Sequence, residues 1–160
     1  MTESKPVPTL YEWAGGIERV ERLFDAFYQR VPADPILGPV FAHMSPAHAH
    51  TVARFVAEVL GGPALYSGDG SHNHSTMIAK HLNRYLSQEQ RRQWVKVLLE
   101  TADELNLPDD PEFRSALVGY LEWGSRLAVI NSQATQNPIG SAAPMPRWGW
   151  GEVKGPYVPE

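Results

Sequence analysis

One histidine, His81, lies in the apolar stretch MIAKHLNRYL at residues 77–86. An imidazole in such a stretch is costly to bury unless its ring nitrogens find partners. One nitrogen can bond a backbone carbonyl, and the other is then free to bind a metal ion. His81 by itself therefore allows two interpretations, a core histidine satisfied by a carbonyl and an axial metal ligand.

Three further side chains with polar atoms lie on helix faces that are otherwise apolar. Tyr28 shares a face with Phe27, Trp94 lies on the inner stripe of a later helix, and His48 lies one turn before the apolar stripe of a third. Each of them, taken singly, is typical of a residue at the rim of a core. Together with His81 they predict a pocket with one basic ligand and several hydrogen-bond donors.

Helices must position these residues, because helical periodicity dominates the chain and no segment alternates with period two. Apolar residues recur at intervals of three and four from Val20 to Val31, where Pro32 ends the helix. The next helix, through residues 52–60, is stopped by Gly-Gly-Pro at 61–63. Capping signals predict a short leading helix at 9–12, a helix from 87 to 105 and a last helix from 110 to 130. The predicted fold class is all-α.

Two segments show no helical periodicity. Residues 61–76 are rich in Gly, Ser and Asn, which predicts a long loop, and long loops inside compact domains usually serve function. Residues 133–160 are rich in Pro and Gly and predict an irregular C-terminal tail without a fold of its own. Its aromatic residues Trp148, Trp150 and Tyr157 can dock on an apolar patch of the domain or of a partner. We therefore expect an N-terminal extension at 1–8, a helical domain at 9–132 and the tail.

Composition excludes several classes of protein. The 160 residues include no cysteine, which rules out disulfides, thiolate zinc sites, iron–sulfur clusters and covalent haem attachment through C-x-x-C-H. The net charge is −4, and scattered Lys and Arg residues argue against a nucleic-acid partner. No run of 18 apolar residues and no signal peptide is present, so we expect no membrane partner and a cytoplasmic location.

With these residues in place, the chain resembles the truncated haemoglobins, and among them group II. The resemblance runs from about Leu10 to Ser132 and rests on five motifs in order: YEWAGG, LFDAFYQRVPADPILGPVF, LGGPALYS, AKHLNRYLSQEQRRQWVKVLLE and YLEWGSRLAVIN. It implies a two-over-two helical sandwich, the truncated globin fold, around a non-covalently bound haem b. In this chain the loop before His81 is expected to replace most of the usual proximal helix.

The resemblance also implies roles for individual residues. His81 matches the proximal iron ligand and is the only expected metal ligand. Tyr28 and Trp94 match the distal pocket, Phe41 the aromatic residue at the haem edge, and His48 the distal gate. A one-residue gap in FAHMSPAHAH would move the last role to His50.

The remaining haem-binding residues are expected on the same apolar stripes and around His81. Apolar residues should keep water from the iron, and cationic or hydroxyl side chains should bind the haem propionates. The first group comprises Val52, Phe55, Met77, Leu82, Leu86 and Leu98, and the second comprises Tyr66, His74 and Lys80.

A pocket with several donors holds a diatomic ligand too long for bulk oxygen transport. We therefore expect dioxygen and other diatomics to be used in redox chemistry or detoxification, as in peroxide reduction or nitric oxide oxidation by a catalytic set of Tyr28, Trp94 and His48. The expected electron donor is an unidentified reductase, and a homodimer is left open. One alternative is a non-haem metal protein that uses His43, His48, His50, His72 and His74. Another alternative is a helical interaction module without a cofactor.

Overall fold

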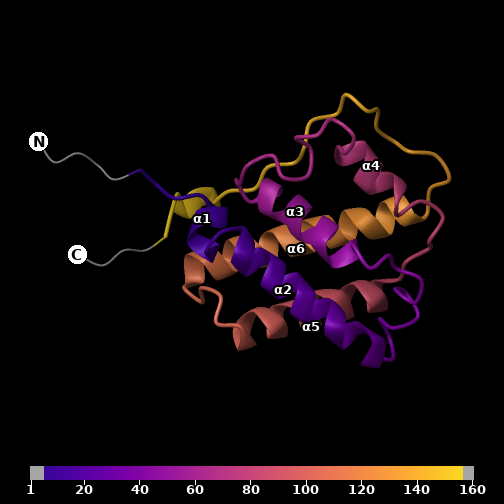
Figure 1. The fold of residues 1–160 in the computed structure, drawn as a ribbon, viewed down its shortest axis with the longest axis horizontal. Coiled ribbons are helices and arrows are strands. Elements are labelled where there is room, and N and C mark those ends of the chain that lie inside the picture. Colours follow the sequence, from indigo (N-terminus) through magenta and orange to yellow (C-terminus); the bar gives the residue numbers. More distant parts are fainter. Residues whose placement is uncertain (1–5, 157–160) are drawn as a thin grey trace, which may run out of the picture.

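The computed structural model describes residues 6–156 and is all-helical, without a strand in that range (Figure 1). No helix in this range combines the length and apolar character that a membrane span requires. The α-helices are α1 (Leu10–Ala14), α2 (Ile17–Arg30), α3 (His48–Val59), α4 (His74–Ala79), α5 (Gln88–Glu104) and α6 (Pro111–Ser132), and the 3-10 helices are η1 (Val31–Ala33) and η2 (Gly151–Val153).

The helices begin where side chains can bond the first free backbone N–H groups. Thr9 and Ser87 form capping boxes with Glu12 and Gln90, and the Asp110 side chain accepts from the backbone N–H of Phe113. These three starts confirm the predicted caps. Gly61 follows α3 with a positive φ of 100°, a conformation that suits glycine.

One prediction about the segment before His81 is wrong. The loop expected to run to Thr76 ends at Asn73, whose side chain accepts from the Thr76 N–H at 2.9 Å while the Thr76 hydroxyl accepts from the Asn73 N–H at 2.9 Å. This reciprocal cap starts the six-residue helix α4. A short helix, rather than a loop alone, therefore precedes His81.

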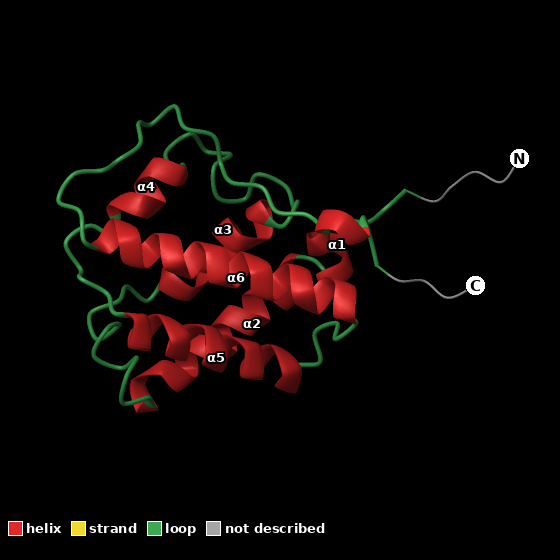
Figure 2. Cartoon of the chain, turned by 180° about the vertical axis from the view of Figure 1, so that it is seen from behind, coloured by secondary structure: helices red, strands yellow, loops and turns green. Residues whose placement is uncertain are grey.

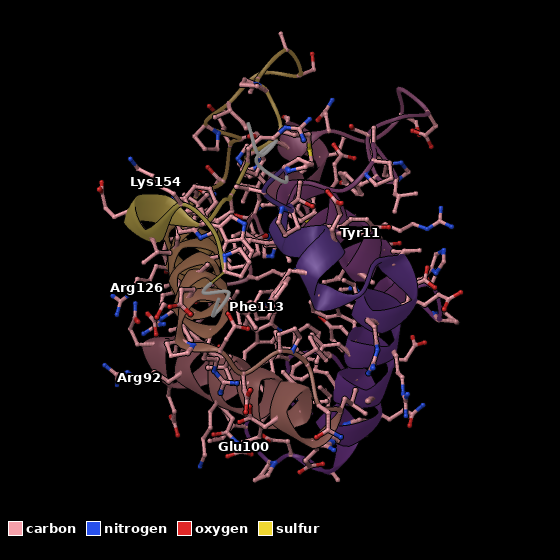
Figure 3. The ribbon with its side chains drawn as sticks, turned by 90° about the vertical axis from the view of Figure 1, so that its left-hand side faces the viewer. Tyr11, Arg92, Glu100, Phe113, Arg126 and Lys154 are labelled. Atoms are coloured by element: carbon pink, nitrogen blue, oxygen red, sulfur yellow. The ribbon has the colours of Figure 1, made fainter. Side chains whose placement is uncertain are left out.

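The helices pack as two pairs, α2 with α3 and α5 with α6, and α2 also contacts α5 (Figure 2). This arrangement is the predicted two-over-two sandwich. Phe24, Phe27, Leu98 and Phe113 are almost fully buried between the pairs. Figure 3 shows Phe113 pointing into this interior, whereas charged residues such as Arg92 lie at the surface.

The C-terminal tail docks on its own helical domain. The indole N–H of Trp148 donates to the Ala116 carbonyl at 3.0 Å, and that of Trp150 donates to the Pro8 carbonyl at 2.7 Å. Trp150 also packs edge-on against Trp13, with ring centroids 6.2 Å apart. The third aromatic residue expected to dock, Tyr157, lies outside the described residues, as do residues 1–5 of the expected N-terminal extension.

Candidate functional site

A cavity of about 650 Å³ lies among the end of α2, the segment after it, α3, α4, α5 and α6. This volume is within the range of about 300–1,000 Å³ that small-molecule and cofactor sites occupy. Most of the expected site residues line it: Tyr28, Phe41, His48, Val52, Phe55, His74, Met77, Lys80, His81, Leu86 and Trp94.

On one side of the cavity, His81 lies in the turn that follows α4. Its Nδ1 atom is 2.9 Å from the Met77 carbonyl oxygen, which can only accept, so Nδ1 carries the proton. Nε2 then keeps its lone pair, the form in which an imidazole binds a metal ion. Burial lowers the pKa of His81 below its usual value, which also favours the neutral ring.

In another part of the cavity lining, aromatic rings pack around the ring of Tyr28. The ring centroids of Phe41 and His48 lie 5.4 Å and 4.8 Å from that of Tyr28, and Phe27 packs edge-on against both Tyr28 and Trp94. His48 Nε2 lies 3.1 Å from the Tyr28 hydroxyl oxygen, within hydrogen-bond distance. This part of the cavity thus combines hydrogen-bonding groups with aromatic rings.

Burial fixes the protonation states of this distal pair. It raises the pKa of the Tyr28 phenol well above its usual value, and the neighbouring Trp94 side chain offsets part of the rise. Burial is the main cause that lowers the pKa of His48 to about 4. Positive charge on Lys80, His81 and Arg84 contributes to this lowering. At neutral pH the phenol therefore keeps its proton and the imidazole is uncharged.

The structure places His48, and not His50, at the cavity. The His50 side chain is 51% exposed, with its Nδ1 atom 3.1 Å from a Glu21 carboxylate oxygen. The Nδ1 atom of His72 lies 3.4 Å from a carboxylate oxygen of Asp69. Within residues 6–156, no three His, Cys, Asp or Glu side chains gather as a metal site would require. The histidine-cluster alternative consequently has no ligand set in the described part of the chain.

Three residues expected to bind haem do not line the cavity. Leu98 is 1% exposed and belongs to the packed core between the helix pairs. Tyr66 is buried, and its hydroxyl lies 3.0 Å from the Thr76 hydroxyl at the start of α4. Leu82 is half-buried next to His81 and is not among the residues that line the cavity. Tyr66 therefore braces α4 from the loop side instead of reaching a propionate.

A wall of the cavity that sequence reasoning missed comes from α6. Tyr120, Gly124 and Ala128 line it, together with Trp123 and Asn131. Tyr120, Gly124 and Ala128 are spaced by four, so they share one helix face on which two small residues leave room. That spacing is the signal that could have indicated a hollow beside α6.

The polar atoms at the cavity fit a dicarboxylate cofactor with a central metal. His74 Nδ1 is buried and has no hydrogen-bond partner among the described residues, so it is available to a bound group. Lys80 and Arg84 bring two cationic side chains to the same lining, where propionates need partners. With His81 Nε2 free and apolar walls around it, the residues present fit haem b.

The pH dependence of stability tests how His48 is held beside its partner Tyr28. The pKa of His48 is about 4 in the folded protein and about 6.5 in the unfolded chain. The unfolded chain therefore binds more protons between these values. The contribution of His48 to the free energy of unfolding is therefore fully present above about pH 6.5 and is lost as the pH drops toward 4.

We expect His48→Gln to flatten this slope, because the variant removes one of the groups that take up a proton on unfolding. Urea unfolding of the haem-free protein at several pH values measures the slope. His74 and His81, whose pKa values burial also lowers, remain in the variant, so part of the slope should persist. Identical slopes in the two proteins would contradict the buried position of His48.

Comparison with known proteins agrees with this geometry. Residues 9–122 match the bacterial-like globin family model. Group 2 truncated haemoglobin YjbI of Bacillus subtilis (strain 168) is 32% identical over 119 residues, which are 74% of this chain and 87% of that protein. The solved group II truncated haemoglobin of Bacillus anthracis gives a TM-score of 0.68 at 26% identity, covering 86% of this chain and 98% of that one.

A second solved structure is similar, the truncated oxygen-avid haemoglobin of Bacillus subtilis. It gives a TM-score of 0.66 at 32% identity and covers 76% of this chain and 99% of that one. The family match, the identities and the two-over-two helical fold all point to the same assignment. The chain belongs to the bacterial-like globins, as a truncated haemoglobin of group II whose cofactor is haem b.

Proposed function

We propose that the protein binds dioxygen at the Tyr28 side of the cavity and uses it to oxidise nitric oxide, rather than to transport oxygen. Haem b, when bound, would supply the iron that takes up diatomic ligands, and His81 would bind that iron. The observation that carries the proposal is the 3.1 Å contact between His48 Nε2 and the Tyr28 hydroxyl, beside Trp94 in one cavity. The solved relative described as oxygen-avid supports tight oxygen binding.

The donors and acceptors of Tyr28, His48 and Trp94 explain how these three side chains act together. The Trp94 indole can only donate, whereas the Tyr28 hydroxyl has one proton and can accept two hydrogen bonds. When the His48 proton is on Nε2, His48 donates to Tyr28, and the phenol proton is free to turn toward a ligand. Tyr28 and Trp94 then both present donors to a ligand that carries partial negative charge, and each adds about 1 kcal/mol of net stabilisation.

The pKa of His48 helps to choose between the two chemistries. Peroxide cleavage is assisted by a base that takes a proton, and such a base works best with a pKa near the working pH. A pKa of about 4 makes His48 a weak base at neutral pH. Oxidation of nitric oxide needs no such base. The oxidation of nitric oxide requires only side chains that hold the oxygen ligand and exclude water.

The electron balance requires a partner. One nitric oxide and one dioxygen form nitrate only with the addition of one electron, which leaves the protein oxidised after each turnover. A reductant must return that electron, and this requirement supports the expected reductase. The cysteine-free composition supports a location in the reducing cytoplasm.

The test mixes nitric oxide with the reduced, haem-loaded protein in air-equilibrated buffer. We expect one nitrate to form for each nitric oxide consumed, and repeated turnover only when a reductant is supplied. An electrode follows nitric oxide and ion chromatography measures nitrate. If nitric oxide disappears no faster than without protein while peroxide oxidises a dye readily, the peroxide reaction replaces the proposed one.

A further inference from the structure

The helix before the proposed iron ligand depends on contacts from outside the helix pairs. Helix α4 has six residues, of which only Ile78 is buried, and it makes at most sparse contacts with any other helix of the described chain. Its last turns lead to His81, and the Met77 carbonyl accepts from His81 Nδ1. Any movement of α4 therefore moves the imidazole.

The first part of the C-terminal tail bonds directly to α4. The side-chain amide of Asn137 donates to the backbone carbonyl of Ser75 at 2.8 Å and to its hydroxyl at 2.9 Å. The Ser75 hydroxyl donates in turn to the Ile139 carbonyl at 3.2 Å, and Asn137 Oδ1 accepts from the Ile139 N–H at 3.1 Å. Figures 1 and 2 both show the chain after α6 passing along the outer side of α4.

The segment that follows His81 is held by the same stretch of chain. The backbone N–H of Asn83 donates to the Ala134 carbonyl at 3.1 Å, and that of Tyr85 donates to the Ser132 carbonyl at 3.0 Å. Asn83 and Tyr85 have φ angles of 63° and 50°, in the left-handed region that is unfavourable for residues with a Cβ. Asparagine tolerates this region, whereas tyrosine rarely adopts it, so the bond to Ser132 helps to maintain the conformation of Tyr85.

Side chains at the end of α6 complete the contact with this segment. The Ser132 hydroxyl accepts from the Leu86 N–H at 2.9 Å, and the Gln133 side chain donates to the Leu86 carbonyl at 3.1 Å. Ser132 is fully buried, so its position is fixed. Farther along the tail, Trp148 is bonded to the domain through Ala116. Both ends of the intervening tail are thus attached.

We propose that residues 132–139 form a C-terminal clamp that positions His81, with Asn137 as a positioning residue for the proximal side of the haem. The clamp bonds the chain on both sides of His81, at Ser75 and at residues 83–86. The functional unit then extends past the expected domain boundary at Ser132, although no described residue after Asn131 lines the cavity. This inference rests on the proposed role of His81 as iron ligand.

The test replaces Asn137 in the full-length, haem-loaded protein. Asn137→Ala removes both bonds to Ser75, and Asn137→Asp removes the donor while keeping the shape and the acceptor for Ile139. Gln136→Ala is the matched control, because this neighbouring amide side chain is exposed and has no hydrogen bond in the structure. Three readouts are used: the rate of haem transfer to an acceptor apoprotein, the iron–histidine stretching band, and hydrogen–deuterium exchange of residues 76–82.

We expect both Asn137 variants to lose haem about fivefold faster or more, the change that loss of one net hydrogen bond produces. The iron–histidine band should shift or broaden, and exchange in residues 76–82 should accelerate, whereas Gln136→Ala should match the parent. Lower thermal stability with an unchanged band and haem-loss rate would reduce the clamp to a structural role and overturn the inference. An iron–histidine band that survives His81→Ala would instead refute the proposed ligand itself.

Discussion

Replacing His81 by alanine is expected to remove the iron ligand and most of the bound haem, seen as loss of the Soret band per protein. The Nδ1 atom of His81 already bonds the Met77 carbonyl, so Nε2 is the nitrogen that can bind iron. His48 Nε2 lies 3.1 Å from the Tyr28 hydroxyl, so this imidazole already has a partner. Full haem retention with an unchanged five-coordinate ferrous spectrum would refute the assignment.

Loss of haem should also lower the stability of the fold. A ligand that binds only the folded state at 1,000 times its Kd stabilises it by about 4.1 kcal/mol, and a tightly held cofactor exceeds that ratio. We therefore expect the thermal midpoint of His81→Ala to approach that of the haem-free parent protein. His72→Ala is the matched control, since this loop histidine contacts Asp69 and does not line the cavity.

Local patterns predicted the elements that the sequence itself encodes. Thr9, Ser87 and Asp110 cap helices through residues three positions away, so their roles are visible in short stretches of sequence. Helix α4 was missed because six residues are too few to show periodicity, and its cap, Asn73, lies in a stretch rich in other loop residues.

Long-range contacts were beyond the reach of such patterns. Capping signals predicted helix α6, but nothing local to that helix shows which of its residues meet another helix and which, like Tyr120, line a cavity. The Asn137 amide bonds Ser75 across 62 positions of sequence, and in a tail rich in breakers a lone polar residue gives no sign of a partner. Tyr66 was predicted to bind a haem propionate through its hydroxyl. In the structure this hydroxyl forms a hydrogen bond with the Thr76 hydroxyl instead.

Removing either of the proposed hydrogen-bond donors to oxygen, Tyr28 or Trp94, should also have a large effect, on the oxygen dissociation rate. If Tyr28 and Trp94 both donate to bound oxygen, Tyr28→Phe and Trp94→Phe should each raise the oxygen dissociation rate about fivefold, for about 1 kcal/mol per donor. Carbon monoxide carries less negative charge and should respond less. Flash photolysis and stopped-flow mixing measure both ligands on the same samples.

The double variant tests whether the two donors act on one ligand. Because Tyr28 and Trp94 would share one acceptor, the combined change should depart from the sum of the single changes. Removing the Tyr28 hydroxyl also leaves His48 Nε2 without its partner at 3.1 Å, so His48→Gln separates that loss from the loss of the donor to the ligand. If both phenylalanine variants release oxygen at the parent rate and differ only in thermal stability, Tyr28 and Trp94 are packing residues. The proposed oxidation of nitric oxide would then lose its support, while His81 could still bind the haem.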